Sequence, residues 1–222
     1  MSLRLFGNKL HPLNMIILQD NFPGSSVDTS KWIVVNTVTV ANGEATLQKT
    51  DNTGTVGGSL RSQALIPHNF VLQWKDRFIT NIALQSGSGF WYNPGVFVRM
   101  SSPDWTQGDN YQMFLTYHAD TNQVVEVFLY ITRRAGSSST SLGRIQIPLN
   151  LLDSLDIEGT GAIANLSVDI NHGDFAISAG GTFVGTLTDA SPLLHKGPIQ
   201  FNDNEGINLT AIEAISEVLI TH

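Results

Sequence analysis

The chain has 222 residues, 41% of them hydrophobic, so it is long enough to bury one sizeable core. Twelve Lys and Arg residues against nineteen Asp and Glu give a formal net charge of -7, which excludes the broad basic surface that nucleic-acid phosphates require. The absence of Cys excludes a disulfide framework and thiolate metal or redox chemistry.

Residues 1–15 combine scattered apolar residues with Pro12 and Asn14, which break any long helix. We expect these residues to form an arm that packs either on the rest of the chain or on a neighbouring subunit, as in a homo-oligomer or a particle. The apolar run at residues 15–18 is too short for a signal peptide or a membrane span. We therefore expect a soluble chain without an export signal or membrane insertion, located on a virion surface or in the cytoplasm.

The first clear strand pattern is a hairpin at residues 38–47. Apolar residues alternate with polar ones on either side of the turn signal Asn42-Gly43. This pattern predicts two short strands with one buried face.

Residues 95–134 are the centre of the predicted fold. They contain three segments rich in β-branched and aromatic residues, separated by polar or Gly-containing linkers. The third, residues 124–131, has few polar residues on either face, which favours a strand inside a sheet and covered on both sides.

Turn signals recur along the rest of the chain at residues 87–89, 136–139, 172–173 and 180–181. Only residues 148–155 have a pattern that permits one or two helical turns. We therefore predict one all-β domain over residues 16–222, built as a two-sheet antiparallel sandwich.

The order of the N-terminal motifs resembles the opening of concanavalin A-like jelly-roll domains, a superfamily that includes laminarinase-type glucanases, laminin-G-like modules and many glycan-binding modules. The motifs are D-x-F-x-G-x-x-x-D-x-S-K-W at residues 20–32, a V-x-x-x-N-G-x-x-x-L hairpin at residues 38–47, and G-G-x-x-R-S at residues 57–62. Residues 95–99 and 166–187 resemble later strands of such domains, and residues 197–201 and 214–220 their closing strands. The resemblance implies a concanavalin A-like jelly-roll β-sandwich.

Laminarinase-type glycosidases carry their catalytic acids on one strand as E-x-D-x-x-E or E-x-D-x-E, because alternate residues share a face. The central segments have no such motif and carry Glu126 alone. The nearest look-alike, Asp156 and Glu158 in LDIEG, lacks a third acid. No G-x-S-x-G elbow or H-E-x-x-H helix occurs, and the six His residues lack ligand spacing. We therefore expect a protein that is not an enzyme.

Aromatic and polar residues of the expected loops and central strands predict a glycan site, because sugars stack on aromatic faces and pair their hydroxyls with short polar side chains. Arg99 stands among apolar residues, where a charge should be paired or should face a cleft. Any aromatic residue of a sandwich can lie in the core instead of at a ligand site. We expect a core position for Trp32 and Trp74. The predicted ligand-binding residues are Trp91, Tyr92, Arg99, Trp105, Tyr111, Gln112 and His118.

The resemblance also implies a calcium ion at the edge of the sandwich, held by oxygen ligands from Asp20, Asp203 and Asn204. Ser216 stands where relatives have an Asp, so one expected carboxylate is missing. No other cofactor is expected.

Our leading interpretation is a non-catalytic, lectin-like carbohydrate-binding module whose partner is a glycan or a glycan-bearing surface. In one form of this interpretation, the module lies on the surface of a virus or phage particle. A structural capsid, decoration or tail protein is one alternative. A glycoside hydrolase-like enzyme is the other. For this second alternative, residues 95–99 and Tyr111-Gln112 are also similar to strands of the 3-keto-disaccharide hydrolase-like group.

Overall fold

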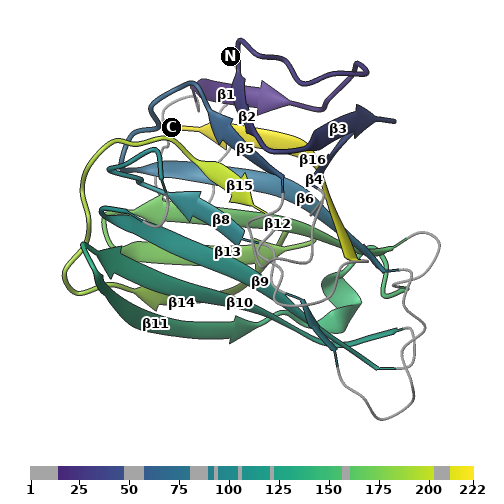
Figure 1. The fold of residues 1–222 in the computed structure, drawn as a ribbon. Helices are drawn as coiled ribbons and strands as arrows, with labels where there is room; N and C mark the ends of the chain where they lie inside the picture. Colours follow the sequence, from purple (N-terminus) through teal and green to yellow (C-terminus); the bar gives the residue numbers. More distant parts are fainter. Residues whose placement is uncertain are drawn as a thin grey trace, which may run out of the picture.

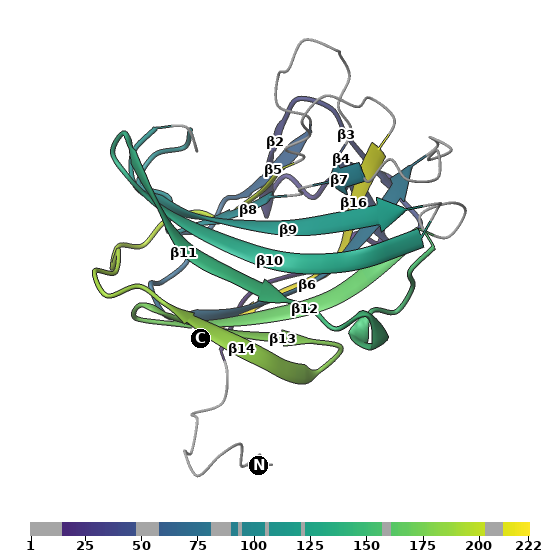
Figure 2. The same cartoon turned by 90° about the horizontal axis from the view of Figure 1, so that it is seen from below.

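The computed structural model describes residues 15–47, 58–80, 90–92, 95–104, 107–120, 123–156, 161–202 and 211–222. Within these ranges, two antiparallel sheets pack face to face, as Figures 1 and 2 show from two directions. The all-β sandwich predicted from the sequence is confirmed. The short apolar run that predicted one or two helical turns forms a single 3-10 turn, η1 (Leu149–Leu151).

One sheet, called here the β6 sheet, is built around a long central strand. Its order is β14 (Thr182–Thr188), β13 (Asp174–Ala179), β12 (Ala162–Asn171), β6 (Phe70–Thr80), β16 (Ala211–Thr221), β4 (Glu44–Leu47) and β3 (Val38–Ala41), and β1 (Ile16–Asp20) also pairs with β16.

The facing sheet, called the β9 sheet, contains the three segments that formed the predicted centre. Its order is β11 (Ser138–Gln146), β10 (Gln123–Ala135), β9 (Asn110–Asp120), β8 (Gly95–Val98), β15 (Gln200–Asn202), β5 (Ser59–Ser62) and β2 (Trp32–Val35), and β7 (Phe90–Tyr92) also pairs with β9. β10 lies between β9 and β11, so the prediction that residues 124–131 form a strand inside a sheet is confirmed. The prediction that this strand is covered on both sides is wrong, because Val125 is exposed and Glu126 and Tyr130 are half-buried.

Local turn chemistry sets the register of the hairpins. Asn42 and Gly43 have φ values of 55° and 81°, and Ala41 pairs with Glu44 across them. Positive φ at both central positions is the two-residue turn that matches the twist of the strands, and Asn-Gly is its preferred sequence. Gly180 and Gly181 form a second such turn, with φ values of 53° and 76°.

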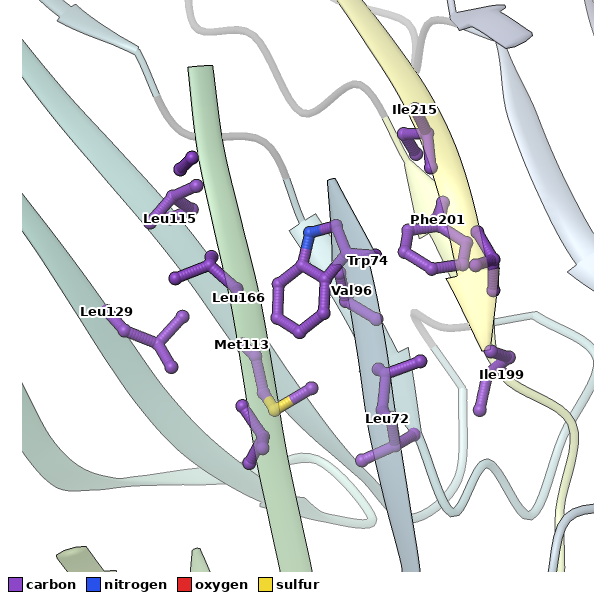
Figure 3. Close-up of a cluster of buried hydrophobic side chains, with 14 of the residues drawn as sticks. Leu72, Trp74, Val96, Met113, Leu115, Leu129, Leu166, Ile199, Phe201 and Ile215 are labelled. Carbon is purple, nitrogen blue, oxygen red and sulfur yellow. The ribbon is translucent and has the colours of Figure 1, made fainter. Parts of the chain in front are cut away.

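The core lies between the two sheets and is filled from both. Trp32 and Trp74 are 0% and 1% exposed, as predicted, and both rings pack edge-on against Phe201 of β15. Figure 3 shows Trp74 and Leu166 from the β6 sheet among side chains of the β9 sheet such as Met113. Burying one such side chain contributes roughly 1.5–3 kcal/mol, so no single contact dominates the core.

Arg99 joins three loops at one end of the sandwich. It follows β8 with a φ of 50° and is 1% exposed. Its Nε donates to the carbonyl of His68 at 2.8 Å, and its Nη1 donates to the carbonyls of His172 at 2.6 Å and Leu193 at 2.7 Å. The guanidinium therefore ties the end of a β9-sheet strand to the loop before β6 and the β12–β13 turn.

Replacing this guanidinium should destabilise the fold. In Arg99→Ala the three carbonyls lose their donor, and we expect the free energy of unfolding to fall by about 3 kcal/mol, measured by urea denaturation. Lys196→Ala is the control, because Lys196 is exposed and its removal should change stability by less than about 0.5 kcal/mol. Equal urea midpoints for the two variants would show that the Arg99 contacts do not stabilise the fold.

Candidate active site

β9 divides its side chains between the two faces of its sheet. Its sequence is NYQMFLTYHAD, and the odd-numbered residues 111–117 all belong to the core between the sheets. Successive strand residues point to opposite faces, so the even-numbered residues lie on the outer face. These are Asn110, Gln112, Phe114, Thr116 and His118.

The strands β10 and β11 continue this outer face. On β10 the core residues are Val127, Leu129 and Ile131, so the residues between them face outward with their partners on β9. The outward cross-strand pairs are Asn110 with Arg134, Gln112 with Thr132, Phe114 with Tyr130, Thr116 with Phe128 and His118 with Glu126. Arg144 and Gln146 of β11 stand opposite Tyr130 and Phe128. We call these outward residues of the three strands the β9–β11 face.

Part of the β9–β11 face is accessible and part is buried, because Asn110, Gln112, Phe128 and Thr132 are at most 8% exposed. Arg144 and Gln146 are exposed, and Phe114, His118, Glu126, Tyr130 and Arg134 are half-buried. On the neighbouring strands β15 and β5, Asn202 and Ser59 are 0% exposed. A ligand that enters from solvent therefore meets the β9–β11 face first.

The ionisable pair of the β9–β11 face is Glu126 with His118. Oε2 of Glu126 lies 3.6 Å from Nδ1 of His118, and their side chains are 42% and 24% exposed. The two groups form an ion pair when the imidazole is protonated. A half-exposed carboxyl group beside an imidazole can exchange a proton with a bound ligand.

Aromatic rings form the middle of the β9–β11 face. The Phe114 ring packs edge-on against Phe97 of β8 with centroids 6.0 Å apart, and the guanidinium carbon of Arg144 lies 4.5 Å from the centroid of Phe128. Hydrogen bonds from Ser141 and Thr132 lower the pKa of Tyr130. Apolar rings with hydroxyl and amide groups beside them are the surface that sugars require.

Two of the predicted ligand residues, Gln112 and His118, lie on this outer face, but Arg99 and Tyr111 do not. Tyr111 is 0% exposed, and its hydroxyl donates to Oδ2 of Asp189 at 2.7 Å and accepts from the N–H of Leu193 at 2.9 Å. Arg99 is held by backbone carbonyls, with its guanidinium carbon 5.5 Å from the Tyr111 ring. The placement of Arg99 and Tyr111 beside a surface ligand is therefore corrected: both lie in the interior.

The three other predicted ligand residues are only partly described. The Cα atoms of Trp91 and Tyr92 on β7 pair with those of His118 and Tyr117, which brings this strand to the edge of the β9–β11 face. Their side chains and the whole of Trp105 lie outside the described residues. Their ligand roles stay predictions.

Of the three predicted calcium ligands, Asp20 alone lies among the described residues. Oδ1 of Asp20 accepts the N–H of Phe22 at 2.9 Å, and Oδ2 accepts Nε1 of Trp32 at 2.8 Å with the Lys31 ammonium 3.7 Å away. A carboxylate whose oxygens are engaged by donors and a cation does not suit calcium. Asp203 and Asn204 lie outside the described residues, and within the described part no group of three His, Asp or Glu residues is arranged to hold a metal ion. The calcium ion stays a prediction.

Two further predictions fall near the edge of the described chain. Asp156 is exposed after η1, and Glu158 lies outside the described residues, so the LDIEG segment is not tested as a site. Residues 1–14 of the predicted arm are also outside, so a role of this arm in assembly stays a prediction. No described helix is long and apolar enough to cross a membrane.

Sequence reasoning missed Phe114, Phe128, Tyr130 and Arg144. The signal for the first three was present, because the core residues of β9 alternate with residue 114 and those of β10 alternate with residues 126, 128 and 130. The same alternation separates Tyr111 from Gln112, which are adjacent and cannot share a face.

Comparison with solved structures identifies the fold. The structure of a Bacillus licheniformis β-glucanase matches with a TM-score of 0.61 at 12% identity, covering 92% of this chain and 96% of that one. An endo-β-1,3-glucanase from Pyrococcus furiosus matches with a TM-score of 0.61 at 11% identity, over 94% of both chains. Porphyranase B from Zobellia galactanivorans matches with a TM-score of 0.60 at 10% identity, over 98% and 97%. No protein-family model and no curated protein matches the chain.

These matches confirm the predicted concanavalin A-like jelly-roll fold. They also correct two expectations. The named structures with this fold are glycan-cleaving enzymes, matched over nearly their whole length. The interpretation as a non-catalytic lectin-like module is therefore wrong, as is the expectation of a protein that is not an enzyme, and the hydrolase alternative is favoured. Nothing in these matches supports a viral or decoration protein or a particle assembly.

The interior position of Tyr111 has a measurable consequence at alkaline pH. Burial, with the Asp189 hydrogen bond, raises the pKa of Tyr111 from 10.0 to about 12. Above pH 10 the unfolded chain releases this proton and the folded chain retains it. The stability is therefore complete below pH 10 and decreases as the pH rises towards 12, by about 1.4 kcal/mol per unit.

Tyr111→Phe removes this group. The slope of the free energy of unfolding against pH should therefore become shallower by the contribution of one proton. Denaturant unfolding at several pH values between 9 and about 12 measures the slope. The variant also loses the Asp189 and Leu193 hydrogen bonds, which should cost about 1–2 kcal/mol at neutral pH. Identical slopes for the two proteins would show that Tyr111 ionises as an exposed phenol does.

Proposed function

We propose that this chain is a glycoside hydrolase. It cleaves a glycan bound on the β9–β11 face of its concanavalin A-like jelly-roll fold. The observation that carries the proposal is the half-exposed carboxyl group of Glu126, 3.6 Å from His118, at one end of an accessible row of aromatic and polar side chains. The endo-glycanases named above support it because they share the fold along nearly their whole length.

Glu126 supplies the proton-transfer group. Glycosidic bond cleavage requires a carboxylic acid that protonates the leaving oxygen and a second carboxylate that acts as nucleophile or base. Residues 110–118 and 124–146 form most of β9, β10 and β11. Within these two ranges, Glu126 is the one Asp or Glu. Because the imidazole of His118 stands directly opposite, it can exchange a proton with this carboxyl group or stabilise its ionised form.

The aromatic part of the β9–β11 face supplies sugar binding. Phe114 and Tyr130 form one cross-strand pair, and Thr116 and Phe128 form the next pair towards Glu126. Positions 126 and 130 are four residues apart, roughly 13 Å along the strand, so a glycan stacked on the half-buried Tyr130 ring can extend to the Glu126–His118 pair. The rings bind the C–H surfaces of the glycan, and Gln146 on β11 can pair with its hydroxyls.

Glu126→Gln tests the proposed acid. It keeps the shape of the side chain and removes the proton-transfer group, so hydrolysis should fall by about 100-fold or more. The assay measures new reducing ends from β-1,3-glucan, mixed-linkage β-glucan, porphyran, carrageenan and mucin O-glycans. Asp120→Asn tests a second acid of the same strands, because Asp120 ends β9 and its Cα pairs with that of Gln123.

The matched control is Glu217→Gln. Glu217 lies on β16 of the other sheet with its side chain 63% exposed, so activity should be unchanged. Wild-type hydrolysis that survives in Glu126→Gln would remove Glu126 from the reaction. No hydrolysis by the wild type on any of these glycans would overturn the proposed function.

A further inference from the structure

The arginines of the described chain differ in what they pair with. Arg77 forms an ion pair with Glu44, Arg133 lies 3.1 Å from Oδ1 of Asp189, and Arg99 is held by backbone carbonyls. The remaining three form no ion pair with any carboxylate of the described residues. They are Arg61, Arg134 and Arg144.

All three of these arginines lie on the outer face of the β9 sheet. Arg134 and Arg144 belong to the β9–β11 face, opposite Asn110 and Tyr130. Arg61 lies on β5, where the neighbouring Leu60 points into the core, so Arg61 faces outward. In a chain with a net charge of -7, the described arginines without an acidic partner are thus placed on one face.

The charge of the β9–β11 face itself is opposite to that of the whole chain. Arg134 and Arg144 face outward there with Glu126 as the carboxylate among the described side chains of the three strands. Asp109, just before β9, accepts the N–H of Gly136 at 2.8 Å but forms no ion pair with Arg134. The face therefore carries Glu126 at one end, Arg144 over its middle and Arg134 at the other end, where Asp109 is also bound to Gly136.

Arg144 retains donors for a ligand. Its guanidinium carbon lies over the Phe128 ring, 4.5 Å from the centroid, and the residue is exposed. Arg134 uses Nε to donate to the carbonyl of Gly136 at 3.1 Å. A guanidinium fork binds sulfate or carboxylate groups through two parallel hydrogen bonds, and stacking on an aromatic ring orients the fork in advance.

We propose that the glycan of the β9–β11 face is an anionic polysaccharide, carrying sulfate or uronic carboxylate groups that Arg144 and Arg134 bind. This inference rests on the proposed function for the site and adds the class of its substrate. Tyr130, opposite Arg144, and Arg134 are four residues apart on β10, which is roughly 13 Å along the strand. The two guanidinium groups thus contact different sugar units of one chain.

Matched polymers test the proposal. Binding to the Glu126→Gln protein, which prevents turnover, is measured by calorimetry with carrageenan against its desulfated form and polygalacturonate against its methyl ester. The charged member of at least one pair should bind about tenfold more tightly, since one charge-assisted contact is worth roughly 1.5–3 kcal/mol. The pair that responds identifies sulfate or carboxylate as the anion.

The arginines are then replaced one at a time in the same protein. Arg144→Gln and Arg134→Gln should each weaken binding of the charged polymer by about tenfold and leave the neutral one unchanged. Lys196→Gln, an exposed cation outside the face, is the control and should bind as before. The preference should also diminish in 1 M salt, where charges are screened beyond about 3 Å.

The outcomes separate this inference from the proposed function. If the wild type cleaves a neutral glucan, Glu126→Gln abolishes cleavage, and neither charged polymer is preferred, the hydrolase stands and the anionic substrate is overturned. If a charged polymer binds through Arg144 and no glycan is cleaved, the anionic ligand stands and the hydrolase is overturned. Equal binding by Arg144→Gln, Arg134→Gln and Lys196→Gln overturns the role of the arginines.

Discussion

The two-residue alternation along β9 and β10 is the constraint on which both the fold and the site depend. It sends Tyr111, Met113 and Leu115 between the sheets and presents Gln112 and Phe114 on the outer face. A register shift of one residue would bury the polar set and expose the core set, so the core that stabilises the sandwich also fixes which side chains a ligand meets. Packing and site geometry therefore cannot vary independently on these strands.

Three buried acids each accept a hydrogen bond from an aromatic side chain. Trp32 donates to Asp20, Tyr111 donates to Asp189, and Tyr117 donates to Asp76 at 2.9 Å. The last of these bonds joins β9 to β6, so it crosses from one sheet to the other. In a chain without disulfides or a described metal cluster, such bonds and the Arg99 contacts add directional links to a core that is otherwise non-directional.

The sequence predicts most of the fold because its signals are local. Asn42-Gly43 and Gly180-Gly181 occupy turns that require positive φ, and the alternation around them sets the buried faces. The site is predicted less well because pairing partners are distant in sequence. Nothing local places Arg99 beside the carbonyls of His172 and Leu193, 73 and 94 residues away, so its charge among apolar neighbours resembles a ligand group. The residues next to Arg99 in the sequence therefore do not distinguish it from an arginine that binds a ligand at the surface.

The same reasoning explains why the sequence alone favours a binding module over an enzyme. A catalytic strand of the E-x-D-x-x-E type is recognisable because its acids share one strand, but a sheet can also bring groups together across strands. His118 and Glu126 are eight residues apart and directly opposite each other, with a bulge between Val124 and Glu126 that sets this register. A search limited to one strand therefore cannot detect an acid–base pair built from two, and the absence of the single-strand motif does not exclude hydrolysis.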